Sequence, residues 1–186
     1  MVSSETAAFS DSLTSRVIID EEPTDVIIWN VKPDASFASE IMTHLALMRR
    51  TEGISVKNFS LDIAAGTTSA QSIARLARAH VRVVLVSSDF INALVEDQLT
   101  IDASDAVIAA RNRDRENYRL IPTLVRPVSE EAYKKDPLLG KIQGLPRNGR
   151  PIQGWRSHDE AWADTVTELR QVLIDLGRLP APKRSW

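Results

Sequence analysis

The chain has 186 residues, 43% of them hydrophobic and 26% charged, which is the size and composition of one globular domain with short tails. Its formal net charge of −2 argues against nucleic-acid binding, which needs a dense basic face. No apolar run is long enough to span a membrane and the start does not read as a signal peptide, so we expect a cytoplasmic protein without a membrane partner.

The side-chain chemistry narrows the possible functions further. The absence of Cys excludes disulfides and thiol nucleophiles, and the three His, at positions 44, 80 and 158, lack the spacing of metal ligands. The glycine patterns of P-loop nucleotidases and Rossmann dehydrogenases are also missing. We therefore expect no metal site and no bound cofactor.

Composition divides the chain into one domain and two tails. Residues 1–24 are rich in acidic side chains and are predicted to be a flexible tail. Its charged residues are Glu5, Asp11, Asp20, Glu21 and Glu22, with Arg16 as the single basic residue. The domain is predicted over residues 25–177, and residues 178–186 are predicted to be a second flexible tail.

The first half of the domain predicts two strands and two helices. The apolar, β-branched run at 25–29 is typical of a buried strand, and Asp34 is placed to cap the helix that follows. Residues 54–59 predict a second, weaker strand. After a loop, Thr68 or Ser69 can cap the second helix.

The second half of the domain repeats this alternation. Residues 81–86 are the clearest strand, and the long helical region after them is expected to break near 100–104. Residues 120–125 predict a fourth strand. A capping box at 157–160 opens the last helix, which Gly177 ends. Strands that alternate with helices predict a doubly wound parallel α/β sheet.

Ligands of such sheets bind outside the carboxyl ends of the strands. The predicted strands place four stretches at this edge, residues 29–30, 59–66, 87–88 and 126–127. Their polar and aromatic side chains are therefore the candidate site.

Four segments together carry a resemblance to a known family. Asp25–Phe37 is similar to a first strand and loop usually written D-V-F-I-S-Y-S-x-x-D-x-x-F, and Asp62–Gly66 to a loop written D-I-x-x-G. Val83–Phe90 resembles the strand end L-L-L-V-S-P-D-F. Residues 119–162 resemble I-P-V-I-L-R-P…L-P-x-D-G-x-P-x-x-W…D-E-A-W. In this order and spacing, the chain resembles a bacterial Toll/interleukin-1 receptor (TIR) domain from about residue 25 to residue 176.

The resemblance implies a flavodoxin-like fold, with a doubly wound parallel sheet of about five strands and helices on both faces. It also implies homotypic assembly with itself or other TIR domains through the BB loop. In this chain that loop is Asp62, Ile63, Ala64, Ala65 and Gly66. Enzymatic members cleave NAD at the nicotinamide–ribose bond, as hydrolases or cyclases, so NAD would be a substrate. Many bacterial members serve in innate immunity against phage or as effectors.

Five residues are expected to contact NAD at the carboxyl edge. They are Trp29, Asn30, Asp34, Ser87 and Arg126. The ring of Trp29 can stack on a nicotinamide or adenine ring, or it can pack against the loop after Arg126. Asn30 can hydrogen-bond a ribose, and the Arg126 fork matches phosphate oxygens, although such Arg residues are more often surface charges.

The resemblance implies a catalytic Glu in the helix after the third strand, where it stabilises the cationic ribosyl transition state. Its position falls on Asp105, with Glu96 and Asp102 as fallback carboxylates. Asp is one methylene shorter than Glu, and misplacement of a catalytic group by about 1 Å can cost roughly 100-fold in rate. The alternative is that Asp105 is a solvated helix residue near Arg111 and Arg113.

Two functions remain open on these grounds. One is a defence-signalling protein that binds NAD and cleaves or cyclises it. The other is a catalytically degenerate TIR scaffold or adaptor that acts by homotypic assembly. The replaced Glu and the altered first loop, Trp29-Asn30-Val31 in place of Ser-Tyr-Ser, favour the second. Retained NAD binding is nevertheless the function that we expect first, with the scaffold as the alternative.

Overall fold

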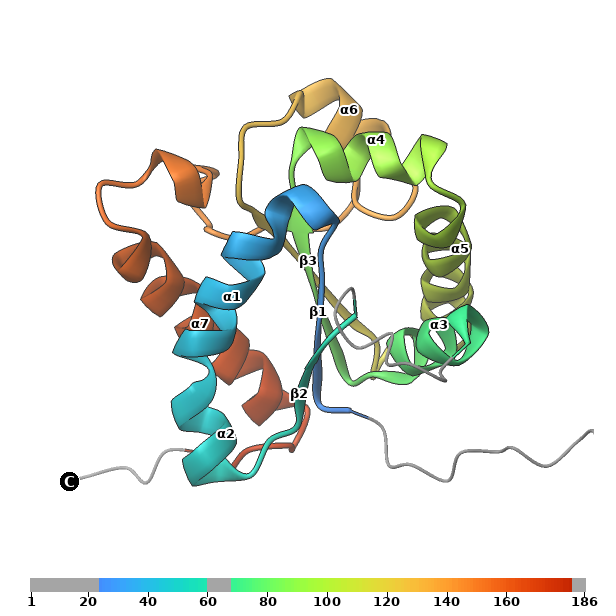
Figure 1. Cartoon of the computed structure of the whole chain (residues 1–186). Helices are drawn as coiled ribbons and strands as arrows, with labels where there is room; N and C mark the ends of the chain where they lie inside the picture. Colours follow the sequence, from blue (N-terminus) through green and yellow to red (C-terminus); the bar gives the residue numbers. More distant parts are fainter. Residues whose placement is uncertain (1–23, 60–67, 182–186) are drawn as a thin grey trace, which may run out of the picture.

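The computed structural model describes residues 24–59 and 68–181, whose strands form one parallel sheet (Figure 1). The strands are β1 (Val26–Trp29), β2 (Val56–Asn58), β3 (Val81–Val86) and β4 (Arg119–Leu124). Their order in the sheet is β2-β1-β3-β4, so the chain extends the sheet first on one side of β1 and then on the other. This order confirms the predicted doubly wound parallel α/β fold.

A single residue stands where a fifth strand would lie. Leu145 pairs in parallel with Thr123 of β4. Its N–H donates to the Pro122 carbonyl at 2.7 Å, and its carbonyl accepts from the Leu124 N–H at 2.8 Å. The expected sheet of about five strands is therefore four strands plus this bridge in the described part of the chain.

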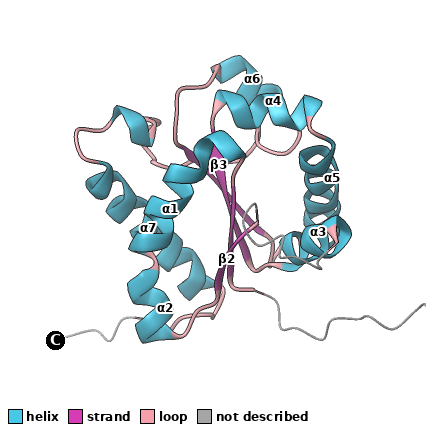
Figure 2. Ribbon diagram, viewed as in Figure 1, coloured by secondary structure: helices cyan, strands magenta, loops and turns pink. Residues whose placement is uncertain are grey.

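Helices cover both faces of the sheet (Figure 2). One face packs against α1 (Ala35–His44) and α7 (His158–Asp175), and the other against α3 (Ser69–Arg78), α4 (Ser88–Glu96) and α5 (Gln98–Arg113). The other helical segments are α2 (Ala46–Glu52), α6 (Glu130–Lys135) and the 3₁₀ turns η1 (Lys32–Asp34) and η2 (Ile152–Gly154). In the described residues, no helix combines the length and the apolarity that crossing a membrane requires.

Alternation along the strands creates two separate cores. Val26 and Ile28 join the core under α1 and α7, whereas Ile27 and Trp29 join the core under α3 and α5. All four residues of β1 are therefore buried. A strand covered on both faces needs a continuous apolar run, which explains why this segment is apolar throughout.

Helix ends agree with the sequence prediction at some positions and differ at others. Thr68 forms a full capping box with Gln71 at the start of α3, as predicted. Asp34 occupies the N-cap position of α1 but makes no side-chain cap, because its carboxylate is bonded elsewhere. The break predicted near 100–104 lies at Asp97, whose carboxylate accepts from the Thr100 N–H at 2.8 Å and caps α5.

The end of α7 extends the packed region beyond residue 177, which corrects the predicted start of the second tail. Gly177 has a φ of 68° and ends the helix, as expected. The Arg178 N–H then donates to the Leu173 carbonyl at 2.8 Å, the pattern of a Schellman cap. Leu179 is 4% exposed and packs into the core under α7. The predicted first tail, apart from Thr24, lies outside the described residues.

Candidate functional site

A buried carboxylate lies just beyond the carboxyl end of β1. Asp34 has no exposed surface, and Ser87 Oγ donates to its Oδ2 at 2.5 Å. Arg126 donates from Nε and Nη2 to Asp34 Oδ1, at 3.0 and 2.6 Å. The same Nη2 also bonds Asp89 Oδ2. We call Asp34, Ser87, Asp89 and Arg126 the edge cluster.

The members of the edge cluster follow the carboxyl ends of three neighbouring strands. Asp34 follows β1, Ser87 and Asp89 follow β3, and Arg126 follows β4, at the top of the sheet in Figure 1. Ser87 has a second contact, because its Oγ accepts from the Phe90 N–H at 3.1 Å and caps α4. The structure thus brings together three of the five residues expected at this edge, Asp34, Ser87 and Arg126.

The edge cluster contains one basic side chain, Arg126, and two acidic ones, Asp34 and Asp89. The hydrogen bond to Asp34 is the main cause that raises the pKa of Arg126, and the bond to Asp89 adds to it. One guanidinium serves two carboxyl groups, so acidic groups outnumber basic ones. The side chain of Arg126 is 30% exposed and that of Asp89 43% exposed, so the outer part of the cluster is accessible while Asp34 is not.

The other two residues expected to contact NAD, Trp29 and Asn30, are both buried. Trp29 is 1% exposed, and its ring packs edge-to-face against Phe59 and Phe90, with centroids 6.0 and 5.2 Å away. The expectation that this ring stacks on NAD is therefore corrected, because alternation along β1 turns it into the core. Asn30 is 3% exposed, and its Nδ2 donates to the Val31 carbonyl at 2.9 Å.

The three candidate catalytic carboxylates are exposed on helices. Asp105 lies on α5, between residues whose side chains face the sheet, and is itself on the solvent side. Glu96 ends α4 and is also exposed. Asp102 accepts a hydrogen bond from Gln98 Nε2 at 2.7 Å on the surface of α5. None of the three contacts the edge cluster, and the catalytic role of Asp105 stays a prediction.

Two further outcomes concern the predicted site. The BB-loop residues, Asp62, Ile63, Ala64, Ala65 and Gly66, lie outside the described residues. Asp89 was not predicted as a site residue, although an acidic residue in the first turn of a helix after a strand end is a recognisable signal. Among the described residues, no group of three His, Asp or Glu is placed to hold a metal ion.

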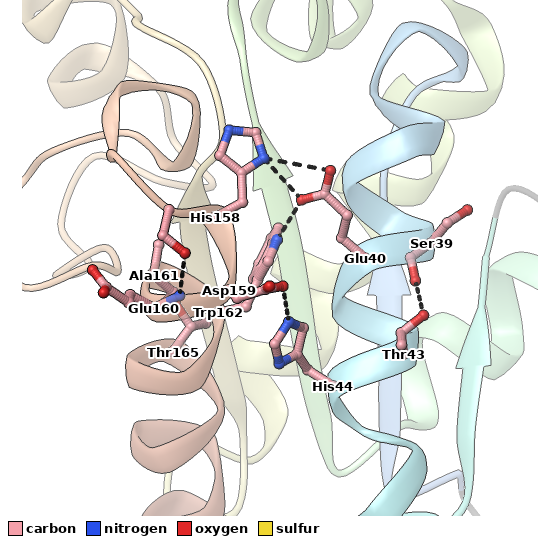
Figure 3. A network of polar contacts seen from close by, with 11 residues as sticks. Ser39, Glu40, Thr43, His44, His158, Asp159, Glu160, Ala161, Trp162 and Thr165 are labelled. Atoms are coloured by element: carbon pink, nitrogen blue, oxygen red, sulfur yellow. Dashed lines mark hydrogen bonds and ion pairs between the residues drawn. The ribbon is translucent and has the colours of Figure 1, made fainter.

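A second polar network joins α1 to α7 (Figure 3). Glu40 Oε2 accepts from the indole Nε1 of Trp162 at 2.6 Å and contacts His158 Nδ1 at 3.2 Å. One turn along, His44 Nε2 lies 3.2 Å from Asp159 Oδ1. Trp162 is fully buried, so Glu40 supplies the partner that its N–H needs.

Comparison with known proteins shows similarity at the level of structure. No family model matches the chain, and no curated protein matches it. Its fold is similar to the crystal structure of the TIR domain of the Toll-related receptor TRR-2 from the lower metazoan Hydra magnipapillata. That similarity has a TM-score of 0.49 at 17% sequence identity, over 79% of this chain and 98% of the receptor domain.

Proposed function

We propose that this chain is a TIR-type signalling module that acts by assembling with TIR domains, including its own copies. Four segments that resemble the family support this proposal, because they occur in the family's order and spacing. The parallel sheet with the order β2-β1-β3-β4 is compatible with it, since a flavodoxin-like sheet has this order.

The hydrogen bonds within the edge cluster are the observation that favours assembly over catalysis. Asp34, Ser87 and Arg126 already bond one another, and Trp29 is packed in the core. A nucleotide could use Asp34 or Arg126 fully only by breaking their contact, which leaves a buried carboxylate without its partner. An edge held in this way suits a rigid docking surface better than an open pocket.

Light scattering over a range of protein concentrations tests the assembly. We expect the apparent mass of the full chain to rise with concentration and the rise to disappear in Ile63→Glu, within the predicted BB loop. Leu47→Glu is the matched control, because Leu47 is 68% exposed on α2 and receives the same chemical change. A wild-type chain that stays monomeric at every concentration would contradict the proposal, as would equal losses in both variants.

NAD binding and cleavage is the second candidate, at the same edge of the sheet. The observation that favours it is the partial exposure of Arg126, a cation at the end of β4 where doubly wound sheets bind ligands. Asp105 would then act from α5 in the place of the family's Glu. A role in bacterial defence against phage rests on the resemblance alone and is proposed with it.

NAD consumption by concentrated protein, with and without a crowding agent, tests this second candidate. Loss of NAD that disappears in Asp105→Ala would establish the enzyme and its carboxylate. Loss that survives this change would move the search to Glu96 or Asp102, and the products would distinguish hydrolysis from cyclisation. If NAD is not consumed under any of these conditions, the cleavage candidate is wrong.

A further inference from the structure

A cleft of about 560 Å³ lies at the opposite end of the sheet from the edge cluster. It opens where β3 and β4 begin and where α3, α5 and α7 end. Its charged lining is dominated by basic side chains from all three helix ends and from β3. These are Arg78, His80, Arg82, Arg113 and Arg178, with Asp114 as the acidic residue among the described residues that line it. We call it the basic cleft.

Arg82 gives the basic cleft a buried positive charge. Its side chain is in β3, and the residue is 3% exposed. The guanidinium donates to the backbone carbonyls of Leu76, at 2.9 Å, and Ala77, and it lies 4.3 Å above the ring of Tyr118. Burial lowers the pKa of Arg82, but an arginine stays protonated at neutral pH. Carbonyls and a ring solvate this charge without neutralising it.

The acidic groups near the basic cleft are already engaged. The carboxylate of Asp25 accepts from Arg178 Nε at 2.7 Å, and the carboxylate of Asp114 accepts from the backbone and side chain of Asn117. Arg113 is exposed and forms no ion pair with any described residue. It sits in the last turn of α5, and each of the three helix ends at the cleft carries about half a negative elementary charge. The four arginines that line the cleft still outweigh these ends together with Asp25 and Asp114, so a small excess of positive charge remains.

The pKa of His80 is lowered, in part by the positive charges around the basic cleft. Burial is the main cause that lowers its pKa, and the positive charges of Arg178 and Arg82 lower it further. Asp25 acts in the opposite direction but does not cancel them. The positive charges of Arg82 in β3 and of Arg178 after α7 thus outweigh Asp25 and disfavour a proton on His80.

Tyr118 contributes an unsatisfied donor to the same cleft. Its hydroxyl oxygen is buried and has no hydrogen-bond partner among the described residues. Burial raises the pKa of this hydroxyl to about 12, so it is present as a neutral donor. Buried hydroxyl groups in folded proteins are nearly always hydrogen-bonded, so this donor is available to an acceptor that enters the cleft.

We propose that the basic cleft binds a small polyanion of the phosphate class, with room for two linked phosphates. Arg113 contacts its oxygens at the mouth of the cleft, since guanidinium forks match phosphate geometry. Arg178 keeps its ion pair with Asp25 and adds to the surrounding charge. Arg82 stabilises the bound charge from beneath, and the Tyr118 hydroxyl donates to an acceptor oxygen. This site is separate from the edge cluster and does not depend on the proposed assembly or on NAD.

Titration calorimetry of the full chain with inorganic pyrophosphate tests the proposal. We expect binding that weakens with salt, and affinity about tenfold lower in Arg113→Gln, the loss of one hydrogen bond to a charged group. Arg156→Gln is the matched control, because it removes the same charge from an exposed residue outside the cleft, and its affinity should change less than about twofold. Equal weakening in the two variants would overturn the proposal.

Tyr118→Phe keeps the ring under Arg82 and removes only the hydroxyl. We expect several-fold weaker pyrophosphate binding without loss of thermal stability, because the hydroxyl has no described partner in the free protein. The His80 resonance in proton NMR provides a second readout, since a bound polyanion raises the pKa of this imidazole. No binding by the wild-type chain, or a His80 titration that pyrophosphate does not shift, would contradict the site.

Discussion

Arg126 Nη2 lies 2.6 Å from Asp34 Oδ1, although the two residues are 92 positions apart in the sequence. The contact ties the loop after β4 to the turn after β1, across β3 that lies between them. Asp34 is fully buried, whereas the Arg126 side chain is 30% exposed. Arg126 therefore stabilises a carboxylate that is not exposed to water.

Removal of Arg126 should destabilise the fold more than removal of a surface arginine. In Arg126→Met, the buried Asp34 loses its cation, and we expect the free energy of unfolding to fall by on the order of 3 kcal/mol. Urea denaturation measures this change. The control is Arg147→Met, which breaks a pair with Glu168 whose arginine is 71% exposed and should cost less than about 1 kcal/mol. Similar losses in both variants would contradict the structural role of Arg126.

The edge cluster shows what the sequence predicts and what it leaves out. Ser87 and Arg126 were expected at one edge because the carboxyl ends of parallel strands coincide. That Asp34 would bond Arg126 rather than cap α1 was not predictable locally, since capping rules consider neighbouring residues and this partner is distant in the chain. The burial of Trp29 was within reach, because alternation places it on the same face as Ile27.

The segment between β4 and α7 was the least predictable part of the fold. Its helix α6 and the bridge at Leu145 lie between the strand predicted at 120–125 and the capping box at 157–160, where the sequence predicts no helix or strand. A helix of six residues has too few turns for a periodic pattern. A bridge of one residue has no alternation at all, so Leu145 depends on its two hydrogen bonds to β4.

Glu40 is expected to be important for the contact between α1 and α7. In Glu40→Ala, the buried Trp162 N–H loses its acceptor, and we expect a loss of about 1–3 kcal/mol in the free energy of unfolding. Glu40→Gln keeps an acceptor oxygen for this N–H and should lose less. Thr43→Ala, on the same helix, removes only an exposed bond to the Ser39 carbonyl and serves as the control. A ranking with Thr43→Ala as the most destabilising change would refute this role.

The lowered pKa of Asp25 predicts that part of the free energy of unfolding is lost in acid. Burial alone would raise the pKa of its carboxyl group, but the Ser55 backbone N–H and the Arg178 side chain outweigh this effect and hold the pKa below the ordinary 3.8. A lowered folded-state pKa stabilises the fold above the unfolded value, and this stabilisation is lost as the pH falls below 3.8 towards the folded value. We therefore expect the stability gap between wild type and Asp25→Asn to narrow over that range. Parallel stability curves from pH 6 to pH 2, ~4 units that cover both titrations, would contradict this assignment.

Gly140 is expected to tolerate no side chain, because an added Cβ would collide with backbone atoms. A Cβ at this position would lie 2.1 Å from the Lys134 carbonyl oxygen and 2.8 Å from that of Asp136, both backbone atoms at the end of α6. Since neither is a flexible side-chain end, the chain itself must shift, and Gly140→Ala should cost about 1–3 kcal/mol. The matched control is Gly154→Ala, whose Cβ would meet the Arg150 side chain at an ordinary 3.5 Å and should change stability by less than about 0.5 kcal/mol. Thermal unfolding of the two variants side by side measures the difference, and equal melting temperatures would show that the turn after α6 is looser than these contacts require.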